Sequence, residues 1–249
     1  MRGVSRTAER SRRSRELPPP LPPETRTVGQ LVAETVRFYG RRFWASLTLG
    51  LPPASLVVAE APLTQLERLV LLVTAGSILL TASYVAACVL VADERRGSLA
   101  LAFAVGALVF VPVPVLTTAF VLPGLAWLAL FGLAVPAVLR EGRGFRASLR
   151  RGIELARADY VHALGSLATL VIVVFLSQGV LFFLLRGAGE AAVAVAGFLA
   201  SLVISPLLFL GAALLYDDQV ARVRSSKTDG ALPRGKPAAS RPVRHPSSR

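Results

Sequence analysis

Residues whose side chains could catalyse a reaction or bind a metal are few and far apart in this chain of 249 residues. Cys88 is the single cysteine, and the two histidines, His162 and His245, lie in different parts of the sequence. A zinc site needs three or four such ligands brought together, and a disulfide needs a second cysteine. The zinc-protease, serine-hydrolase, P-loop and dinucleotide-binding patterns are also missing from the sequence. The sequence therefore predicts no metal, no cofactor and no catalytic residue.

Acid and base chemistry by carboxylates is the remaining catalytic hypothesis. Tyr216-Asp217 resembles half of the motif pair of intramembrane aspartyl proteases, in which two carboxylates divide the acid and base roles. No aspartate within a second apolar segment supplies the partner, and Cys88 has no basic neighbour that would favour a thiolate. We therefore expect a protein that is not an enzyme. The residues that an enzyme would have to use are Glu60, Glu141, His162 and Asp217.

Charge is scarce and segregated along the chain. Charged residues make up 17% of the sequence and hydrophobic residues 53%, with a mean hydropathy of +0.58, whereas soluble proteins are about one quarter charged. The 28 Lys and Arg residues outnumber the 15 Asp and Glu residues, for a net charge of +13. This composition excludes disorder over most of the chain and indicates a membrane-embedded protein. We expect no nucleic-acid partner, because a membrane orientation accounts for the basic residues.

Uncharged runs long enough to cross a bilayer predict an all-α, polytopic transmembrane helix bundle with six spans. A crossing needs about 20 apolar residues. Residues 97–139 are too many for one crossing, and their prolines favour two helices joined by a turn at 116–122. Pro52 and Pro53 interrupt the first span, which is expected to be kinked, short or partly re-entrant. The spans are expected at about 43–60, 69–92, 98–116, 121–139, 161–185 and 191–216, within a membrane domain of residues 28–216.

Basic residues give this bundle an orientation. If the connecting segments alternate between two sides, the side that holds both termini carries 26 Lys and Arg residues and the other side carries 2. By the positive-inside rule, both termini are cytoplasmic and the protein is a multi-pass protein of the inner (cell) membrane. Residues 1–27, rich in Arg and Pro, and residues 217–249, a basic cytoplasmic tail, are expected to be mostly disordered.

Two charged segments have apolar residues at the three- and four-residue spacing of an amphipathic surface helix. The first set is Val28, Val32, Val36, Tyr39 and Phe43, and the second is Phe145, Leu149, Ile153, Ala156 and Tyr160. The two sets superimpose at a constant offset of 117 residues, which suggests a duplicated unit covering residues 28–92 and 145–216. The second helix should lie in the cytoplasmic headgroup layer, where arginines contact anionic lipid. The simpler alternative is that its arginines only fix the topology. They are Arg143, Arg146, Arg150, Arg151 and Arg157.

Small and polar residues within the spans indicate how the helices meet. Ala192, Ala196 and Ala200 form a row of small residues that lets two helix backbones approach closely, either within the bundle or between two copies. Gln178 is a mid-span amide, which needs a hydrogen-bonding partner in a cavity or in a helix contact.

The segment after the fourth predicted span carries a family resemblance. Residues 135–157, which read VPAVLREGRGFRASLRRGIELAR, and the closing Ala213–Asp218 resemble motifs of a large, little-characterised bacterial family. Its six-span members are similar to the membrane domain of some glycerophosphoryl diester phosphodiesterases, and the resemblance covers about residues 25–224. Gly152 departs from the family serine at that position. The resemblance implies no catalysis, because the phosphodiesterase active site lies in a barrel domain that this sequence lacks.

These observations lead to one functional hypothesis and one alternative. The first is a non-enzymatic integral membrane protein that serves as an accessory, scaffold or lipid-interacting component of the bacterial inner membrane. Its partners would be membrane lipids and either another membrane protein or a second copy of the chain. The alternative is a transporter or channel component, which the repeat and the Pro52-Pro53 break favour and the absence of charge deep in the spans opposes.

The predicted topology can be tested with reporter fusions. Fusions at residues 65, 118 and 188 are expected to report the outer side of the membrane, and fusions at 96, 150 and 230 the cytoplasm. Activity of the cytoplasmic reporter at 118 would contradict the division of residues 97–139 into two spans.

Overall fold

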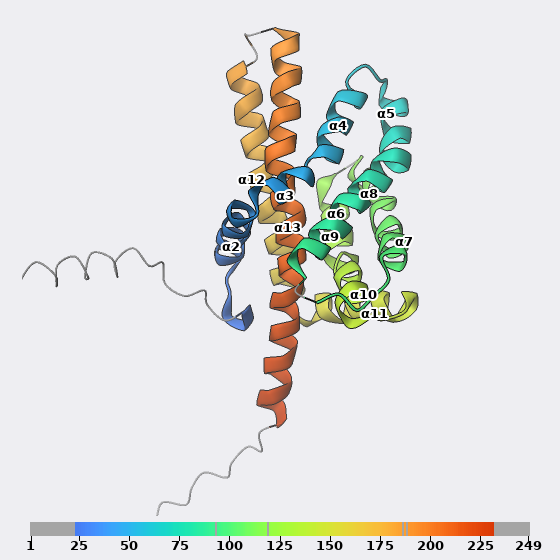
Figure 1. Cartoon of the computed structure of the whole chain (residues 1–249), viewed down its shortest axis with the longest axis vertical. Helices are drawn as coiled ribbons and strands as arrows, with labels where there is room; N and C mark the ends of the chain where they lie inside the picture. Colours follow the sequence, from blue (N-terminus) through green and yellow to red (C-terminus); the bar gives the residue numbers. More distant parts are fainter. Residues whose placement is uncertain (1–22, 93, 119, 186, 188, 232–249) are drawn as a thin grey trace, which may run out of the picture.

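The computed structural model describes residues 23–231 except 93, 119, 186 and 188. Within them the chain is all-helical and has no strand (Figure 1), as predicted. The elements are the 3₁₀ turn η1 (Pro23–Thr25), α2 (Val28–Arg41), α3 (Phe43–Thr48), α4 (Leu51–Glu60), α5 (Gln65–Leu71), the π-helical turn η2 (Leu72–Gly76), α6 (Ser77–Val91), α7 (Leu99–Phe110), α8 (Pro112–Thr117), α9 (Val121–Phe131), α10 (Ala134–Glu141), α11 (Phe145–Ala158), α12 (Tyr160–Leu185) and α13 (Glu190–Ala231).

Five helical segments of the described residues are long and apolar enough to cross a membrane, which indicates a multi-pass membrane protein. The long apolar interval is divided between two of them: α8 ends at Thr117, and Phe120, whose backbone is extended (φ −150°, ψ 147°), precedes the start of α9. The five segments are Gln65–Val91, Leu99–Thr117, Val121–Glu141, Tyr160–Leu185 and Ala191–Ser225.

The predicted first span is built from two short helices, α3 and α4, and is not one of these five segments. The interruption lies at Leu49 and Gly50, just before the two prolines rather than at them. Pro52 and Pro53 occupy the first turn of α4, where the missing N–H groups break no intrahelical hydrogen bond. A complete sixth crossing by residues 43–60 therefore stays a prediction.

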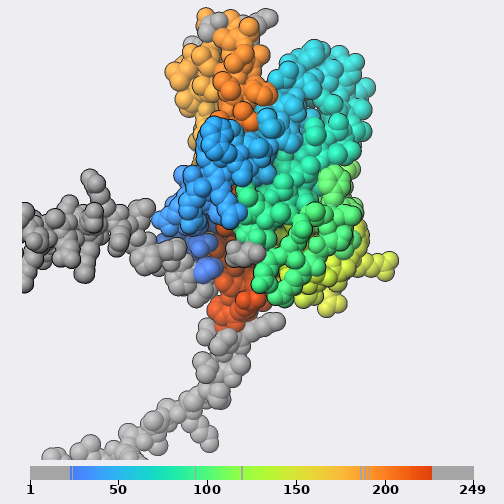
Figure 2. Space-filling model, viewed as in Figure 1, coloured from blue at the N-terminus to red at the C-terminus, as the bar shows by residue number. Residues whose placement is uncertain are grey.

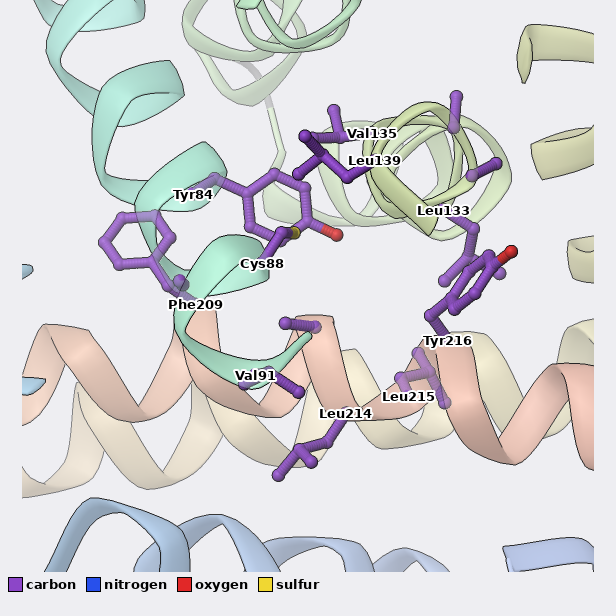
Figure 3. Packing of buried hydrophobic residues seen from close by; sticks show 14 of the residues in the cluster. Tyr84, Cys88, Val91, Leu133, Val135, Leu139, Phe209, Leu214, Leu215 and Tyr216 are labelled. Atoms are coloured by element: carbon purple, nitrogen blue, oxygen red, sulfur yellow. The ribbon is translucent and has the colours of Figure 1, made fainter. Parts of the chain in front are cut away.

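Helix α13 runs along most of the molecule, and several of the other helices pack against it (Figure 1). Its contacts include α2, α4, α6, α11 and α12. Figure 3 shows the core, where Tyr84 and Cys88 of α6 lie between α10 and the part of α13 that carries Phe209 and Leu215. The Tyr84 hydroxyl donates a hydrogen bond to the carbonyl of Gly132 at 3.0 Å, which satisfies the polar end of a buried side chain.

The two tails are shorter than the sequence predicts. Helix α13 continues beyond residue 216 to Ala231, so the expectation of a disordered tail is wrong for residues 217–231. Asp218 and Gln219, just after the span, are completely buried, and this packing stabilises the helix. At the other end, η1 and the buried Arg26 correct the boundary at residue 27. The predicted disorder of residues 1–22 and 232–249 lies outside the described residues.

Both predicted surface helices form. Helices α2 and α11 have equal length, and the offset between both their starts and their ends is the predicted 117 residues. Helix α2 begins with a capping box, in which Thr27 Oγ1 accepts from the Gln30 amide and Gln30 Oε1 accepts from the Thr27 amide at 2.7 Å. The two helices lie on different sides of α13 (Figure 1).

Gly50 permits the closest approach of α4 to α13, and this contact can be tested. A Cβ atom at residue 50 would overlap the carbonyl oxygen of Leu202, so Gly50→Ala is expected to lower the free energy of unfolding by about 1–3 kcal/mol. Gly40→Ala is the matched control, because a Cβ at that helical position meets no atom within 4 Å. It should leave stability unchanged or raise it by up to about 1 kcal/mol. Titration with SDS in mixed micelles measures both; equal stability of the two variants would contradict the packing.

Candidate functional site

The five arginines proposed to contact lipid do not share one environment. Arg146, Arg150 and Arg157 are exposed on α11, whereas the Arg151 side chain is only 18% exposed. Arg151 and Arg143 donate to the carboxylate of Glu141, which belongs to the neighbouring helix α10. The structure therefore divides the set into three arginines that face outward on α11, Arg151, which joins α11 to α10, and Arg143, which is exposed in the connection between the two helices.

Helix α11 attaches to the bundle through small residues and through part of the predicted apolar set, since Ala156 is buried and Leu149 packs against the core. Its buried residues are Ser148, Gly152, Leu155 and Ala156. A Cβ atom at Gly152 would lie 2.7 Å from the backbone nitrogen of Ala134, so only glycine permits this crossing of α11 and α10. Phe145, the first residue of the predicted apolar set, is 39% exposed. The position where the resembled family has serine is thus the point of closest approach.

One of the exposed arginines of α11 forms an ion pair with a carboxylate of the same helix. Arg150 Nε donates to Glu154 Oε1 at 2.9 Å, in an exposed pair one helical turn apart. This hydrogen bond is the main reason that the pKa of Glu154 is lowered, so Glu154 is ionised at neutral pH. Arg146 and Arg157 form no ion pair with any described residue, so the outward face of α11 keeps a net positive charge.

Where α10 meets α13, ion pairs and hydrogen bonds form a network centred on Glu141. The Tyr216 hydroxyl donates to Glu141 Oε1 at 2.6 Å, and Arg151 Nε donates to the same oxygen at 3.1 Å. Arg140 pairs with Asp217, and its guanidinium lies 5.6 Å from the centre of the Tyr216 ring. These contacts hold α10 against α13, and through Arg151 they hold α11 against α10.

A second network joins α13 to the N-terminal segment and to the start of α12. Arg26 Nη1 donates to Asp218 Oδ1 at 2.7 Å, and the two side chains are 11% and 0% exposed. Arg222 pairs with Asp159 at 2.8 Å and donates to the backbone oxygen of Arg26 at 2.6 Å. Gln219 Nε2 donates to the backbone oxygen of Asp159 at 3.3 Å. Sequence reasoning missed these partners, which are 60 or more residues apart.

A polar groove of about 830 Å³ opens beside the Glu141 network. Both positively charged arginines and negatively charged carboxylates line it, so the groove has a charged surface at this end of the bundle. Each of its carboxylates is engaged: Glu94 by Arg96, Asp217 by Arg140, and Glu141 as described above. The lining residues are Pro23, Glu94, Arg96, Arg140, Glu141, Tyr216, Asp217, Val220, Ala221 and Arg224. This arrangement suits the binding of a charged group better than proton transfer.

The other residues singled out in the sequence are dispersed. Gln178 is half-buried on α12, and its side chain makes no hydrogen bond to another described residue. Cys88 is buried in the core. The His162 ring lies 3.4–3.5 Å from Arg222, and Glu60 ends α4 in another part of the fold. Among the described residues, no three His, Cys, Asp or Glu side chains are grouped as metal ligands.

The buried Arg26–Asp218 pair can be tested by removing its cation. Arg26→Ala leaves the Asp218 carboxylate buried without that partner, and we expect the free energy of unfolding to fall by about 3 kcal/mol. Glu94→Ala is the control, because it breaks an exposed pair whose side chains are 76% and 70% exposed, at a cost below about 1 kcal/mol. Both are measured by SDS titration; similar losses for the two variants would show that the buried pair contributes no more than an exposed one.

Comparisons with known proteins supply no relative for this arrangement. No family model matches the chain, and searches of curated proteins and of solved structures gave no significant match.

Proposed function

We propose that this chain is a non-enzymatic component of a bacterial inner membrane that acts by binding anionic lipid at its cytoplasmic face. One observation carries the proposal: α11 is fixed to the bundle through Gly152 and the Glu141 network, and it directs Arg146, Arg150 and Arg157 outward. Figure 2 shows α11, in yellow, projecting from the lower right of the bundle. A rigid row of guanidinium groups is suited to phosphates, which they bind in a bidentate manner.

The asymmetry of basic residues supports the cytoplasmic assignment of this face. Each arginine near an anionic membrane surface contributes about 1 kcal/mol to the binding free energy. Three arginines held on one helix therefore give a larger preference for anionic lipid than a single arginine that only fixes the topology. The engagement of every carboxylate in the polar groove supports a binding role over catalysis. The family resemblance also favours an accessory or scaffold role. In the resembled phosphodiesterases the active site lies in a barrel domain, and the membrane domain itself is not catalytic.

The transport alternative receives less support from the interior of the bundle. The pocket within it has a volume of only about 50 Å³ and is lined by Tyr84, Gly132, Leu133 and apolar side chains of α7, α9, α12 and α13. Gln178 does not line this pocket. A solute pathway would need a wider conformation than this one.

The proposal is tested by measuring lipid preference in nanodiscs. The chain is reconstituted with spin-labelled phosphatidylglycerol or phosphatidylcholine, and electron paramagnetic resonance gives the relative association constant of each lipid. The triple variant Arg146→Gln, Arg150→Gln and Arg157→Gln is expected to lose preference for phosphatidylglycerol, by up to about fivefold for each arginine. Arg68→Gln is the control, since this exposed arginine lies on α5 at the opposite end of the molecule (Figure 1).

An unchanged preference in the triple variant would contradict the proposal. A stoichiometric protein retained by the wild-type chain on extraction from native membranes, and lost by the triple variant, would replace lipid with a protein partner as the function of this face.

A further inference from the structure

A second groove lies between α3, α6 and α7, away from α11. Its volume is about 690 Å³, within the range of about 300–1,000 Å³ that small-molecule sites occupy. Apolar side chains line nearly all of it, and among the described residues of its lining only Arg95 is ionisable. The lining residues are Ala45, Thr48, Leu49, Ala82, Val85, Ala86, Val89, Leu90, Arg95, Leu99, Ala100 and Phe103.

Small side chains make this groove. Ala45, Ala86 and Ala100 each come from a different helix, line the groove and are exposed, so no other side chain of the described residues fills the space between the helices. From Ala82 to Leu90 the groove follows α6 for about 12 Å, at about 1.5 Å per residue. Two of its walls belong to segments that can span a membrane, and this length corresponds to nearly half of a hydrocarbon layer about 30 Å thick. The groove therefore has the depth of one leaflet.

Positive charge lies at one end of the groove. Arg95 is exposed in the connection between α6 and α7. Arg42, just before α3, is also exposed, and its Nη1 donates to the carbonyl of Leu90 at 3.0 Å, which places it beside the same end of α6. Neither arginine forms an ion pair with a described residue. A guanidinium has five N–H donors, so Arg42 keeps several for a ligand after binding Leu90.

We propose that this groove binds one anionic phospholipid of the inner leaflet, with an acyl chain along the three alanines and its phosphate between Arg42 and Arg95. Lipid tails are as apolar as the helices they touch, so an apolar groove alone selects no lipid in a bilayer. Selection comes from the two guanidinium groups, which favour a phosphate in a headgroup of net negative charge. This site goes beyond the proposed role of α11, because different residues form it.

The test is native mass spectrometry of the full chain released from nanodiscs that contain equal amounts of phosphatidylglycerol and phosphatidylcholine. We expect the wild-type chain to retain one phosphatidylglycerol. Ala86→Phe fills the groove and should reduce retention at least tenfold, whereas Arg42→Gln with Arg95→Gln should retain either lipid without preference. Since residue 86 is exposed to the groove, the added ring displaces no buried side chain, and an unchanged melting temperature confirms that the variant is folded.

The α11 triple variant separates this inference from the proposed function. It should still retain the groove lipid in native mass spectrometry, while it loses the preference for phosphatidylglycerol that electron paramagnetic resonance measures. Retention of phosphatidylglycerol by Ala86→Phe at the wild-type level would overturn the groove site. Loss of the retained lipid in the α11 triple variant, with no loss in the groove variants, would also overturn it. A fatty acid or detergent held in place of the phospholipid would also overturn it, because the two arginines are assigned to a phosphate.

Discussion

The arrangement of the helices depends on two carboxylates that follow the apolar span of α13. Asp217 and Asp218 are adjacent, so they point to different sides of the helix, and each meets an arginine from another part of the chain: Arg140 from α10 and Arg26 from the N-terminal segment. Burying a carboxylate is unfavourable unless a cation and hydrogen bonds accompany it. The two arginines therefore fix where α10 and η1 lie against α13, and α10 in turn positions α11.

Local sequence patterns predict the elements of this fold well. Helical spacing identifies both surface helices, and the prolines between residues 97 and 139 indicate where the long apolar interval divides. The sequence does not predict the extent of α13, because residues 217–222 are mostly polar and their side chains are held by partners far away in the sequence. For the same reason, Arg26 looks like part of a disordered tail until Asp218, 192 residues later, is placed beside it.

The candidate site divides in the same way. Composition places arginines on α11, but it cannot show which of them face outward, because that depends on Glu141 of α10. The apolar residues of α11 indicate only part of the packing face, because Ala156 is buried but Phe145 is exposed, and they do not indicate the close approach at Gly152. The groove with Arg42 and Arg95 combines three helices and a connection, and no local spacing indicates it.

The distance along the chain between Arg26 and Asp218 has a consequence for biogenesis. The ribosome makes about 5–20 residues per second, so Arg26 emerges about 10–40 s before the aspartate 192 positions later. Every earlier span can enter the membrane while the N-terminal segment is still unattached. The pair between Arg26 and Asp218 can therefore form only after the last helix has been synthesised, and a chain truncated before that helix would leave Arg26 without this partner.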